Sequence, residues 1–494
     1  MIWYNVSEIK DYFKEVNFMD IADLAASAVK KITTGKGKRL AKKGYPAELE
    51  KVSPVTISNK EDGKFDVGFA MKETMPDDFD SKTYYIAGHK MAQKMTGFHD
   101  PITVSAMWIG CGAEGGVMMV TADFIGLTNS EVGLIRASLA DFMKKSNCKA
   151  VNICCTHTHG GFDTVGYWGK LPKSGKVDTY MQKIFKNVKE VCIEAYDNRK
   201  KGDLYVGSTH VPDAQYDKRP PVVLHDTLTR IRFVPDDGSQ ETWLLNYAAH
   251  PNTLGGSNTL CSADYPYFLR QTIYKEKDVN VLYGIGAIGA VDPGFPDIED
   301  RWVRTEKQGV TLGKAALSID NDEKMTPEIT VVQQPFYYYA DNAVLAFLAL
   351  LKVMSSKLVA AKKGDLGLAL VSEMTYMKIG SQQILLMPGE VFPEVAYGGY
   401  DSAEDSATGR GPEIDPTPLT EIAGDDNLLI FGVTNDMTGY VVAPNDFILH
   451  KTQPYLSSGR DRFDRNHYHE TNSMGYSAAE TLTNVFADIM KRVK

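Results

Sequence analysis

From residue 65 onward, short apolar runs of strand-forming residues alternate with longer stretches in which apolar residues recur at helical spacing. Strand-like runs occupy residues 116–121, 149–155 and 203–208, and helical patterns occupy residues 129–145 and 178–196. Each pattern predicts one element, because alternate strand positions and every third or fourth helix position face the same side. The alternation predicts an α/β fold with a mixed β-sheet core, flanking helices and functional side chains on loops at strand ends.

Two further patterns lie toward the C-terminus. Residues 341–362 include AVLAFLALLKVM, and Asp341 or Asn342 can cap a helix there. Its uninterrupted apolar core, about nine to twelve residues, is too short to cross a bilayer. We therefore expect a core helix. The alternatives are a helix that forms an apolar wall or lid for an acyl chain, and a helix that faces a membrane. A closing helix is predicted over residues 478–491.

The first 60 residues have a different character. Residues 24–32 have a helical pattern, and residues 30–43, KKITTGKGKRLAKK, form a basic stretch broken by glycine. Such a stretch is typical of a solvated linker, and peripheral contact with anionic lipid head groups is the alternative. We expect a helical and basic extension over residues 1–60, followed by one main domain over residues 61–494.

The opening residues also bear on location. MIWYNVSEIKDYFKEVNFMD carries charges every few positions and contains no apolar signal-peptide core. The chain as given is therefore expected to be cytoplasmic, with membrane association as the alternative.

The most informative motif is VNICCTHTHGG at residues 151–161, where an apolar strand-like run ends in two histidines. His157 and His159 are two positions apart, so on a strand both would face one pocket. Neutral imidazole is the commonest zinc ligand, and the following glycines let a ligand approach the backbone. The pair indicates a metal or catalytic site, although a satisfied structural pair has the same spacing.

Three more segments place a ligand-type side chain just after an apolar run. They are TWLLNYAAHP, ending in His250 and Pro251, QILLMPGE, ending in Glu390, and LLIFGVTNDMTGY, ending in Tyr440. Taken singly, each has a structural interpretation, as a capping histidine, a surface carboxylate or a packed tyrosine. Their occurrence alongside the histidine pair favours a shared metal site.

In this order the segments resemble the catalytic domain of the neutral, or alkaline non-lysosomal, ceramidase family. The motifs that match are THTH at residues 156–159, His-Pro at 250–251, Pro-Gly-Glu at 388–390 and Asn-x-x-x-x-Tyr-Val at 435–441. The resemblance runs from about residue 65 to the C-terminus. It implies a zinc ion held by four ligands, which are His157, His250, Glu390 and Tyr440.

The implied ligand set suits hydrolysis. Two imidazoles, a carboxylate and a phenolic oxygen leave room for a water molecule, which ionises near neutral pH when zinc binds it. The hydroxide can attack an amide carbonyl, with His159 as oxyanion donor or proton shuttle. The resemblance thus predicts a zinc-dependent amidohydrolase acting on an N-acyl sphingolipid or a related lipid-like amide.

Two residues are added by analogy with the family. Arg219, in YDKRPP, matches an arginine of the family's substrate site, and a surface salt bridge is the alternative. Tyr468, in HYHETNSMG, resembles the tyrosine that helps to hold the substrate carbonyl.

The chain also departs from the family. Where the ceramidases carry Gly-Asp-Val-Ser-Pro-Asn, residues 289–294 read GAVDPG, so Asp292 replaces the family serine and Ala290 replaces an acid. An ionised aspartate can act as a base on the zinc-bound water, but it cannot donate a hydrogen bond as serine does. The metal prediction is unaffected, whereas the substrate is open. The alternatives are a different amide or an ester, and a non-catalytic lipid-binding relative that keeps the metal.

Composition excludes other functions. The net charge of −9 argues against a nucleic-acid partner. GIGAIG at residues 284–289 fits a dinucleotide-binding pattern, but Pro293 and Pro296 prevent the helix that the pattern requires. The six cysteines lack paired spacing and are expected to be buried thiols in a reducing compartment. The ceramidases continue into an immunoglobulin-like domain, for which we expect no counterpart here.

Overall fold

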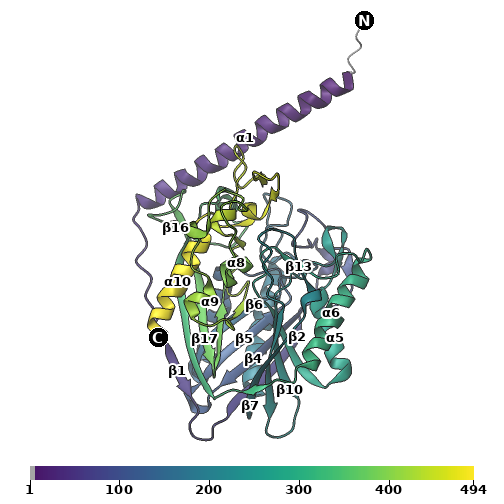
Figure 1. Cartoon of the computed structure of the whole chain (residues 1–494), viewed down its shortest axis with the longest axis vertical. Helices are drawn as coiled ribbons and strands as arrows, with labels where there is room; N and C mark the ends of the chain where they lie inside the picture. Colours follow the sequence, from purple (N-terminus) through teal and green to yellow (C-terminus); the bar gives the residue numbers. More distant parts are fainter. Residues whose placement is uncertain (1–5, 494) are drawn as a thin grey trace.

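The computed structural model describes residues 6–493, with side chains from residue 22 onward. Two β-sheets stack face to face, and helices cover the outer face of each, which gives a four-layer sandwich (Figure 1). The predicted α/β class with mixed sheets is confirmed. Residues 1–5 of the predicted N-terminal extension, and Lys494, lie outside the described residues.

The larger sheet has nine strands in the order β12-β10-β9-β7-β2-β4-β5-β6, with β14 paired to β7. The β5–β6 and β10–β12 pairs are parallel and the others antiparallel. The predicted strands at residues 116–121, 149–155 and 203–208 correspond to β5, β6 and β7, which confirms them. The strands are β2 (Phe65–Glu73), β4 (Thr103–Gly110), β5 (Gly116–Ala122), β6 (Cys148–Cys155), β7 (Lys200–His210), β9 (Thr227–Pro235), β10 (Glu241–Tyr247), β12 (Val279–Ile285) and β14 (Glu323–Lys324).

The smaller sheet has the order β1-β15-β17-β18-β20, with β16 also paired to β17, and β18–β20 is its parallel pair. Its first strand lies within the predicted N-terminal extension, so the end of that segment is part of the sandwich. The predicted boundary near residue 60, between the N-terminal extension and the main domain, stays a prediction. The strands are β1 (Val55–Ser58), β15 (Glu328–Tyr339), β16 (Leu358–Ala360), β17 (Leu368–Ile379), β18 (Gln382–Leu386) and β20 (Leu429–Phe431).

The alternation of side chains along β4 shows why the layers stack. Met107 and Ile109 point into the space between the sheets, where they pack with Val331 of β15. Val104 and Trp108 point the other way, into the core beneath the outer helices. Both faces of the strand are thus apolar, because each is covered by another layer.

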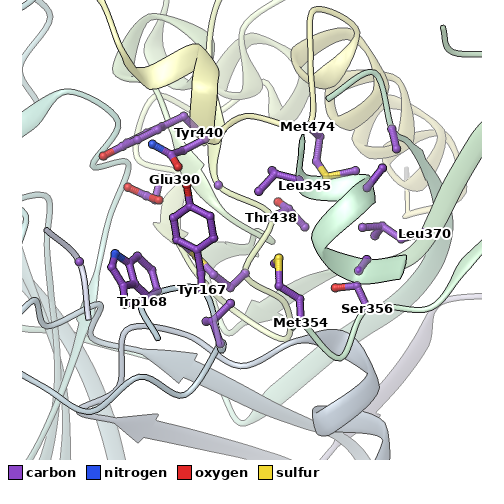
Figure 2. Close-up of a pocket in the computed structure, with 18 of the residues that line it drawn as sticks. Tyr167, Trp168, Leu345, Met354, Ser356, Leu370, Glu390, Thr438, Tyr440 and Met474 are labelled. Atoms are coloured by element: carbon purple, nitrogen blue, oxygen red, sulfur yellow. The ribbon is translucent and has the colours of Figure 1, made fainter. Parts of the chain in front are cut away.

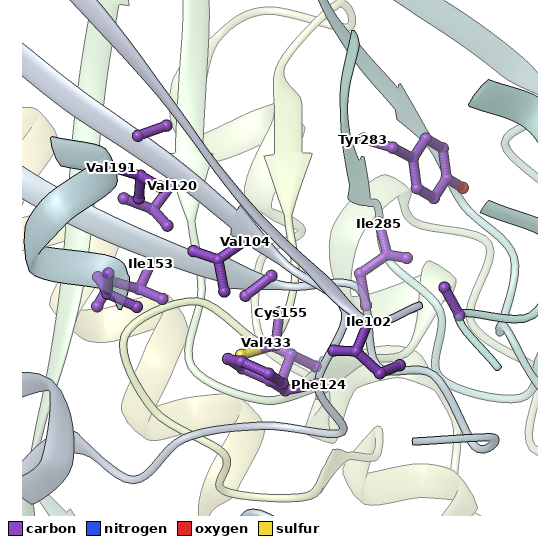
Figure 3. Close-up of a cluster of buried hydrophobic side chains, with 14 of the residues drawn as sticks. Ile102, Val104, Val120, Phe124, Ile153, Cys155, Val191, Tyr283, Ile285 and Val433 are labelled. Carbon is purple, nitrogen blue, oxygen red and sulfur yellow. The ribbon is translucent and has the colours of Figure 1, made fainter. Parts of the chain in front are cut away.

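Helix α4 covers the outer face of the large sheet. Figure 3 shows Val191 of α4 beside Val120 and Ile153, which lie on β5 and β6. The predicted helix at residues 178–196 is confirmed as α4 (Asp178–Asp197). The predicted helix at 129–145 is instead two helices, α2 (Asn129–Ser138) and α3 (Ala140–Ser146), because the backbone leaves the helical conformation at Leu139 (φ −99°, ψ 2°).

The remaining outer helices complete the sandwich. α5 (Tyr265–Glu276) and α6 (Arg301–Ser318) pack on each other beside the large sheet. The predicted C-terminal helix is confirmed as α10 (Ala478–Val493), which packs on β15. Two short helices, α8 (Pro393–Tyr397) and α9 (Leu419–Ala423), lie in the same outer core.

The apolar stretch at residues 341–362 forms a helix that is shorter than its pattern suggested. α7 spans Ala343–Leu350, and Asn342 caps it by accepting hydrogen bonds from the backbone N–H groups of Val344 (3.0 Å) and Leu345 (3.1 Å). The chain then turns and forms β16. Among the described residues, no helix combines the length and apolar character needed to cross a bilayer.

Helix α1 (Val6–Ala41) runs obliquely along one edge of the molecule (Figure 1). The predicted helix at residues 24–32 is confirmed, but the solvated linker expected within residues 30–43 is wrong, because the helix continues through its glycines to Ala41. The helix continues because its C-terminal part docks on the main domain. α1 packs against α7 and β16, and Gly37 lies directly on the backbone oxygen of Leu366. Tertiary contact here overrides the weak helix propensity of glycine.

Two further predictions concern the glycine motif and the cysteines. After GIGAIG the chain forms the short strand β13 (Val291–Pro293), and the next helix begins only at Arg301, so no phosphate-binding helix follows the glycines. All six cysteines are free and buried.

We predict that Gly37→Val will release α1 from the domain. A β-carbon at this position meets the Leu366 oxygen, so α1 must move, at a cost of about 1–3 kcal/mol for overpacking. Gly35→Val is the matched control, since its β-carbon has no neighbour within 4 Å. Hydrogen exchange of residues 22–41 should accelerate in the first variant and stay unchanged in the second. Equal exchange in both variants would contradict this docking contact.

Candidate metal centre

The four predicted metal ligands meet where strands of both sheets end. His157 lies two residues beyond β6, and His250 lies three residues beyond β10, both from the nine-stranded sheet. Glu390 and Tyr440 begin the paired short strands β19 (Glu390–Val391) and β21 (Tyr440–Val441), which follow strands of the six-stranded sheet. The centre therefore spans the two sheets.

Hydrogen bonds tie the segment before Tyr440 to the histidine strand. The backbone N–H of Asn435 donates to the carbonyl of Ile153 (2.9 Å), and its side-chain oxygen accepts from the N–H of Ile153 (2.8 Å). The N–H of Cys155 donates to the carbonyl of Val433 (3.1 Å). The position of Tyr440 is thus fixed relative to His157 by the backbone, before any metal binds.

The spacing suggested that the two histidines of the THTH motif share one strand face, but they do not. β6 ends at Cys155, and His157 has a left-handed backbone (φ 63°). The turn still brings His157 and His159 together, with ring centroids 5.0 Å apart. The prediction of a common pocket is correct, but a loop and not a strand produces it.

Backbone carbonyls orient both predicted histidine ligands. Nδ1 of His157 lies 2.6 Å from the carbonyl oxygen of Ile125, and Nδ1 of His250 lies 3.0 Å from that of Val291. A carbonyl only accepts, so each Nδ1 carries the proton and each Nε2 presents its lone pair. This is the arrangement by which second-shell groups prepare a histidine for a metal.

The centre of the site contains acceptors that face one another. Nε2 of His250 and Nε2 of His157 lie 2.9 Å and 3.3 Å from the same oxygen of Glu390. When neither Nε2 carries a proton, three lone-pair donors converge, which is unfavourable unless a cation lies between them. Burial opposes ionisation of Glu390, but the two histidines in their protonated form outweigh it and lower its pKa to about 2, so a positive charge at this point keeps the carboxylate ionised. The residues present therefore fit a divalent metal ion.

His159 completes a group of three histidines. One ring nitrogen each of His157, His159 and His250 lies within 4.8 Å of the other two. Neither ring nitrogen of His159 has a hydrogen-bond partner, although the residue is 9% exposed. Burial, followed by its histidine neighbours, lowers the pKa of His159 well below the ordinary value. His159 therefore offers a neutral ring with both nitrogens available.

The two predicted tyrosines lie next to each other. Tyr440 is buried among aromatic rings, and burial, followed by the Glu390 carboxylate, raises its pKa well above the ordinary value. Tyr468 is 37% exposed and stacks on His469 with ring centroids 3.8 Å apart. The centroids of the two tyrosine rings are 6.4 Å apart. Tyr468 thus lies on the solvent side of the metal centre.

Arg219 is not in a surface salt bridge, which corrects that alternative. The residue is buried, and its guanidinium donates to Asp446 (2.7 Å) and to Glu470 (2.8 Å). It also contacts Nδ1 of His469 at 2.9 Å, the ring on which Tyr468 stacks. Arg219 is absent from the cavity wall described below. Through these contacts Arg219 supports His469, and with it Tyr468, from the side away from the cavity.

Asp292 lies beside the metal centre and is fully engaged. One carboxylate oxygen pairs with Nζ of Lys218 (2.6 Å), and the other accepts from the amide of Asn252 (3.0 Å). Burial raises the pKa of Asp292, but Lys218 and His250 outweigh it, so the net shift is downward. Asp292 is next to Val291, whose carbonyl orients His250. Asp292 is therefore ionised and paired.

An apolar cavity of about 310 Å³ opens from the metal centre (Figure 2). His157, His159, Glu390 and Tyr440 form one part of its wall. The rest is mainly apolar and comes mostly from α7, from Tyr167 and Trp168 after the THTH motif, and from the segment before β16. Figure 2 shows the labelled residues of this wall, which include Leu345, Met354, Leu370 and Met474. α7 is thus both a core helix and an apolar cavity wall, which joins two of the sequence interpretations.

Several residues of the site carried no usable sequence signal. His89 reaches the site from a loop with no flanking strand pattern, and its ring lies 4.8 Å from that of His159. Lys218 is adjacent to Arg219 in the sequence, but only the fold brings it to Asp292. Tyr167, Trp168 and Met437 line the cavity from loops. A possible signal was the concentration of aromatic residues directly after the THTH motif.

Comparison with known proteins identifies two solved structures with this architecture. The neutral ceramidase from Pseudomonas aeruginosa superposes with a TM-score of 0.65 at 14% sequence identity, over 88% of this chain and 75% of that one. A structure described as ceramidase complexed with C2 gives a TM-score of 0.64 at 13% identity, over 87% and 75%. No family model and no curated protein matches the sequence. At this identity the likeness establishes a shared fold.

We predict that Arg219→Met will destabilise the protein by about 3–5 kcal/mol, because Asp446 and Glu470 remain buried without their cation. The control is Arg460→Met, which breaks an exposed pair with Asp464 and should cost about 0–1 kcal/mol. Urea unfolding of both variants measures the difference.

A different result would assign Arg219 another role. If Arg219→Met unfolds at the same urea concentration as the Arg460→Met control while KM for substrate rises, the residue contacts substrate and does not support the fold.

Proposed function

We propose that the protein is a zinc-dependent hydrolase of neutral ceramidase type, which cleaves the amide bond of an N-acyl lipid or a related lipid-like amide. The observation that carries the proposal is the convergence of lone pairs from His157, His250 and Glu390 at one end of an apolar cavity. Such a cavity suits an acyl chain attached directly to the scissile bond. The fold shared with two ceramidase structures supports the same class of reaction.

His157, His250, Glu390 and Tyr440 are the residues that would hold the zinc ion. A bound zinc would polarise the substrate carbonyl and lower the pKa of a water molecule. The chain itself fixes the geometry: the Nδ1–H bonds to Ile125 and Val291 stop both imidazole rings from turning.

His159 is the proposed group for proton movement. A neutral imidazole has one protonated and one unprotonated nitrogen, and neither nitrogen of His159 is occupied by the protein. It can donate to the oxygen on which charge develops, or pass a proton to the leaving amine. Tyr468, half-exposed with its ring centroid 6.4 Å from that of Tyr440, is the proposed residue that holds the carbonyl oxygen in position.

The acyl chain would lie along α7. Leu345, Ala346 and Ala349 line the cavity, and its volume of about 310 Å³ is at the small end of the roughly 300–1,000 Å³ that is common for ligand sites. Removing the chain from water supplies binding energy of roughly 0.8 kcal/mol for each buried methylene.

We predict about one zinc ion per chain and chelator-sensitive release of fatty acid from N-acyl amides. His157→Ala and His250→Ala should lose zinc and lower kcat/KM by more than about a hundredfold, since residues that only support metal ligands already contribute about 10- to 100-fold. His210→Ala is the control, because His210 lies on the surface and pairs with Asp226. Elemental analysis and an assay with and without chelator measure both effects. Full zinc occupancy in the two ligand variants would refute the assignment.

We also predict that Ala349→Phe will shorten the acyl chain that the enzyme accepts. The larger side chain enters the cavity, so kcat/KM should fall at least about tenfold for a long acyl chain and little for a short one. Leu350→Phe is the matched control, because the neighbouring residue of the same helix is absent from the cavity wall. The same loss for short and long chains, or a loss in both variants, would place the acyl chain elsewhere.

A further inference from the structure

The proposed reaction leaves open what is attached to the amide nitrogen, and the structure offers a polar group of residues for that part. Lys218, Asp292 and Asn252 lie beside His250 and are absent from the wall of the apolar cavity. Tyr468 borders the same group, with its ring centroid 5.9 Å from Nζ of Lys218. The metal centre thus has an apolar wall for one part of a substrate and a charged group for another.

The hydrogen bonds within this group favour one kind of ligand. Each oxygen of Asp292 already accepts one hydrogen bond, so a substrate hydroxyl would have to share the carboxylate with Lys218 or Asn252. Lys218 has three N–H donors, and its side chain remains 35% exposed. An anion can therefore bind to Lys218 without breaking the Lys218–Asp292 pair. A cationic group would instead be repelled by Lys218.

A second cation reinforces the preference. The guanidinium of Arg301 lies on Gly255 and has no hydrogen bond or ion pair within residues 22–493. His89 and Lys90 pack on the adjacent Gly256. Arg301 and Lys90 therefore present basic side chains near the same side of the centre, where they attract an anion before it reaches Lys218. His89 does not add to this charge, because burial lowers its pKa to about 4.

We propose that Lys218, held by Asp292, is the specificity-determining residue for the amine part of the substrate, and that it selects N-acyl amines carrying an anionic group, a carboxylate or a phosphate. The inference rests on the proposed amide hydrolysis and names its substrate class. Asp292 is then a positioning residue: it holds Nζ of Lys218 by an ion pair of 2.6 Å. Lys218 contacts the substrate and takes no part in bond cleavage.

A matched pair of substrates tests the proposal. N-lauroylglycine and N-lauroylethanolamine share the acyl chain and the amide and differ in whether the amine part ends in a carboxylate or in a hydroxyl. We expect kcat/KM to be at least about tenfold higher for N-lauroylglycine, as one charge-assisted hydrogen bond provides. N-lauroyl phosphoethanolamine, measured in the same assay, distinguishes a carboxylate site from a phosphate site.

Lys218→Met should bring the ratio of the two kcat/KM values to about one, and rising salt should lower the ratio in the unmodified protein. The double variant Lys218→Met/Asp292→Asn removes both charges, so it gives the same readout without a buried unpaired carboxylate. Lys275→Met is the control, because Lys275 is exposed on α5, and its ratio should equal that of the unmodified protein.

The outcomes separate the two claims. Chelator-sensitive hydrolysis of both substrates at equal rates, or an unchanged ratio in both Lys218 variants, overturns the role of Lys218 and leaves the amide hydrolysis standing. No chelator-sensitive hydrolysis of any of the three amides overturns the proposed function, and the role of Lys218 with it.

Discussion

The site depends on a single electrostatic constraint, the convergence of buried acceptors at one point between the two sheets. His157 and His250 come from the ends of nine-stranded-sheet strands, and Glu390 comes from the end of a strand in the smaller sheet. Each acceptor is aimed by a bond to the backbone or by strand pairing. Such groups repel one another when none carries a proton, so the packing of the two sheets opposes that repulsion until a proton or a metal cation relieves it.

This constraint explains why the sandwich is tied together near the site. The apolar layer between the sheets fixes their separation but has no preferred lateral position, since hydrophobic contact is not directional. Directional bonds supply the registration: Asn435 pairs with Ile153 on β6, and Arg136 of α2 donates to both carboxylate oxygens of Glu373 on β17 (2.8 Å each). The first link lies within five residues of both His157 and Tyr440, and the second joins α2 to the smaller sheet. Close control of ligand geometry therefore follows from ordinary backbone and ion-pair contacts.

The sequence was sufficient for features that depend on local pattern. Apolar periodicity predicted the strands that precede the candidate ligands. The order of the family-like motifs predicted which residues gather at the centre, and the residue type predicted the cap at Asn342. Features that depend on tertiary contact were not accessible. The continuation of α1 through Gly37 needs the Leu366 carbonyl opposite it, and the burial of Arg219 needs carboxylates more than 200 positions away. His157 was predicted to face the right pocket for the wrong reason, because its left-handed backbone leaves no mark in composition.

Asp292 places a charged side chain next to the candidate metal centre. An isolated carboxylate beside Glu390 would add a second negative charge to a buried centre and weaken the lone-pair arrangement that a cation has to satisfy. Lys218 removes that conflict, since the pair is neutral and leaves the charge of the metal ligands unaltered. The charge of the candidate metal centre is thus independent of the ionic group next to it. Under the proposed function, bond cleavage and recognition of the amine part rest on different residues, which share only a boundary at His250.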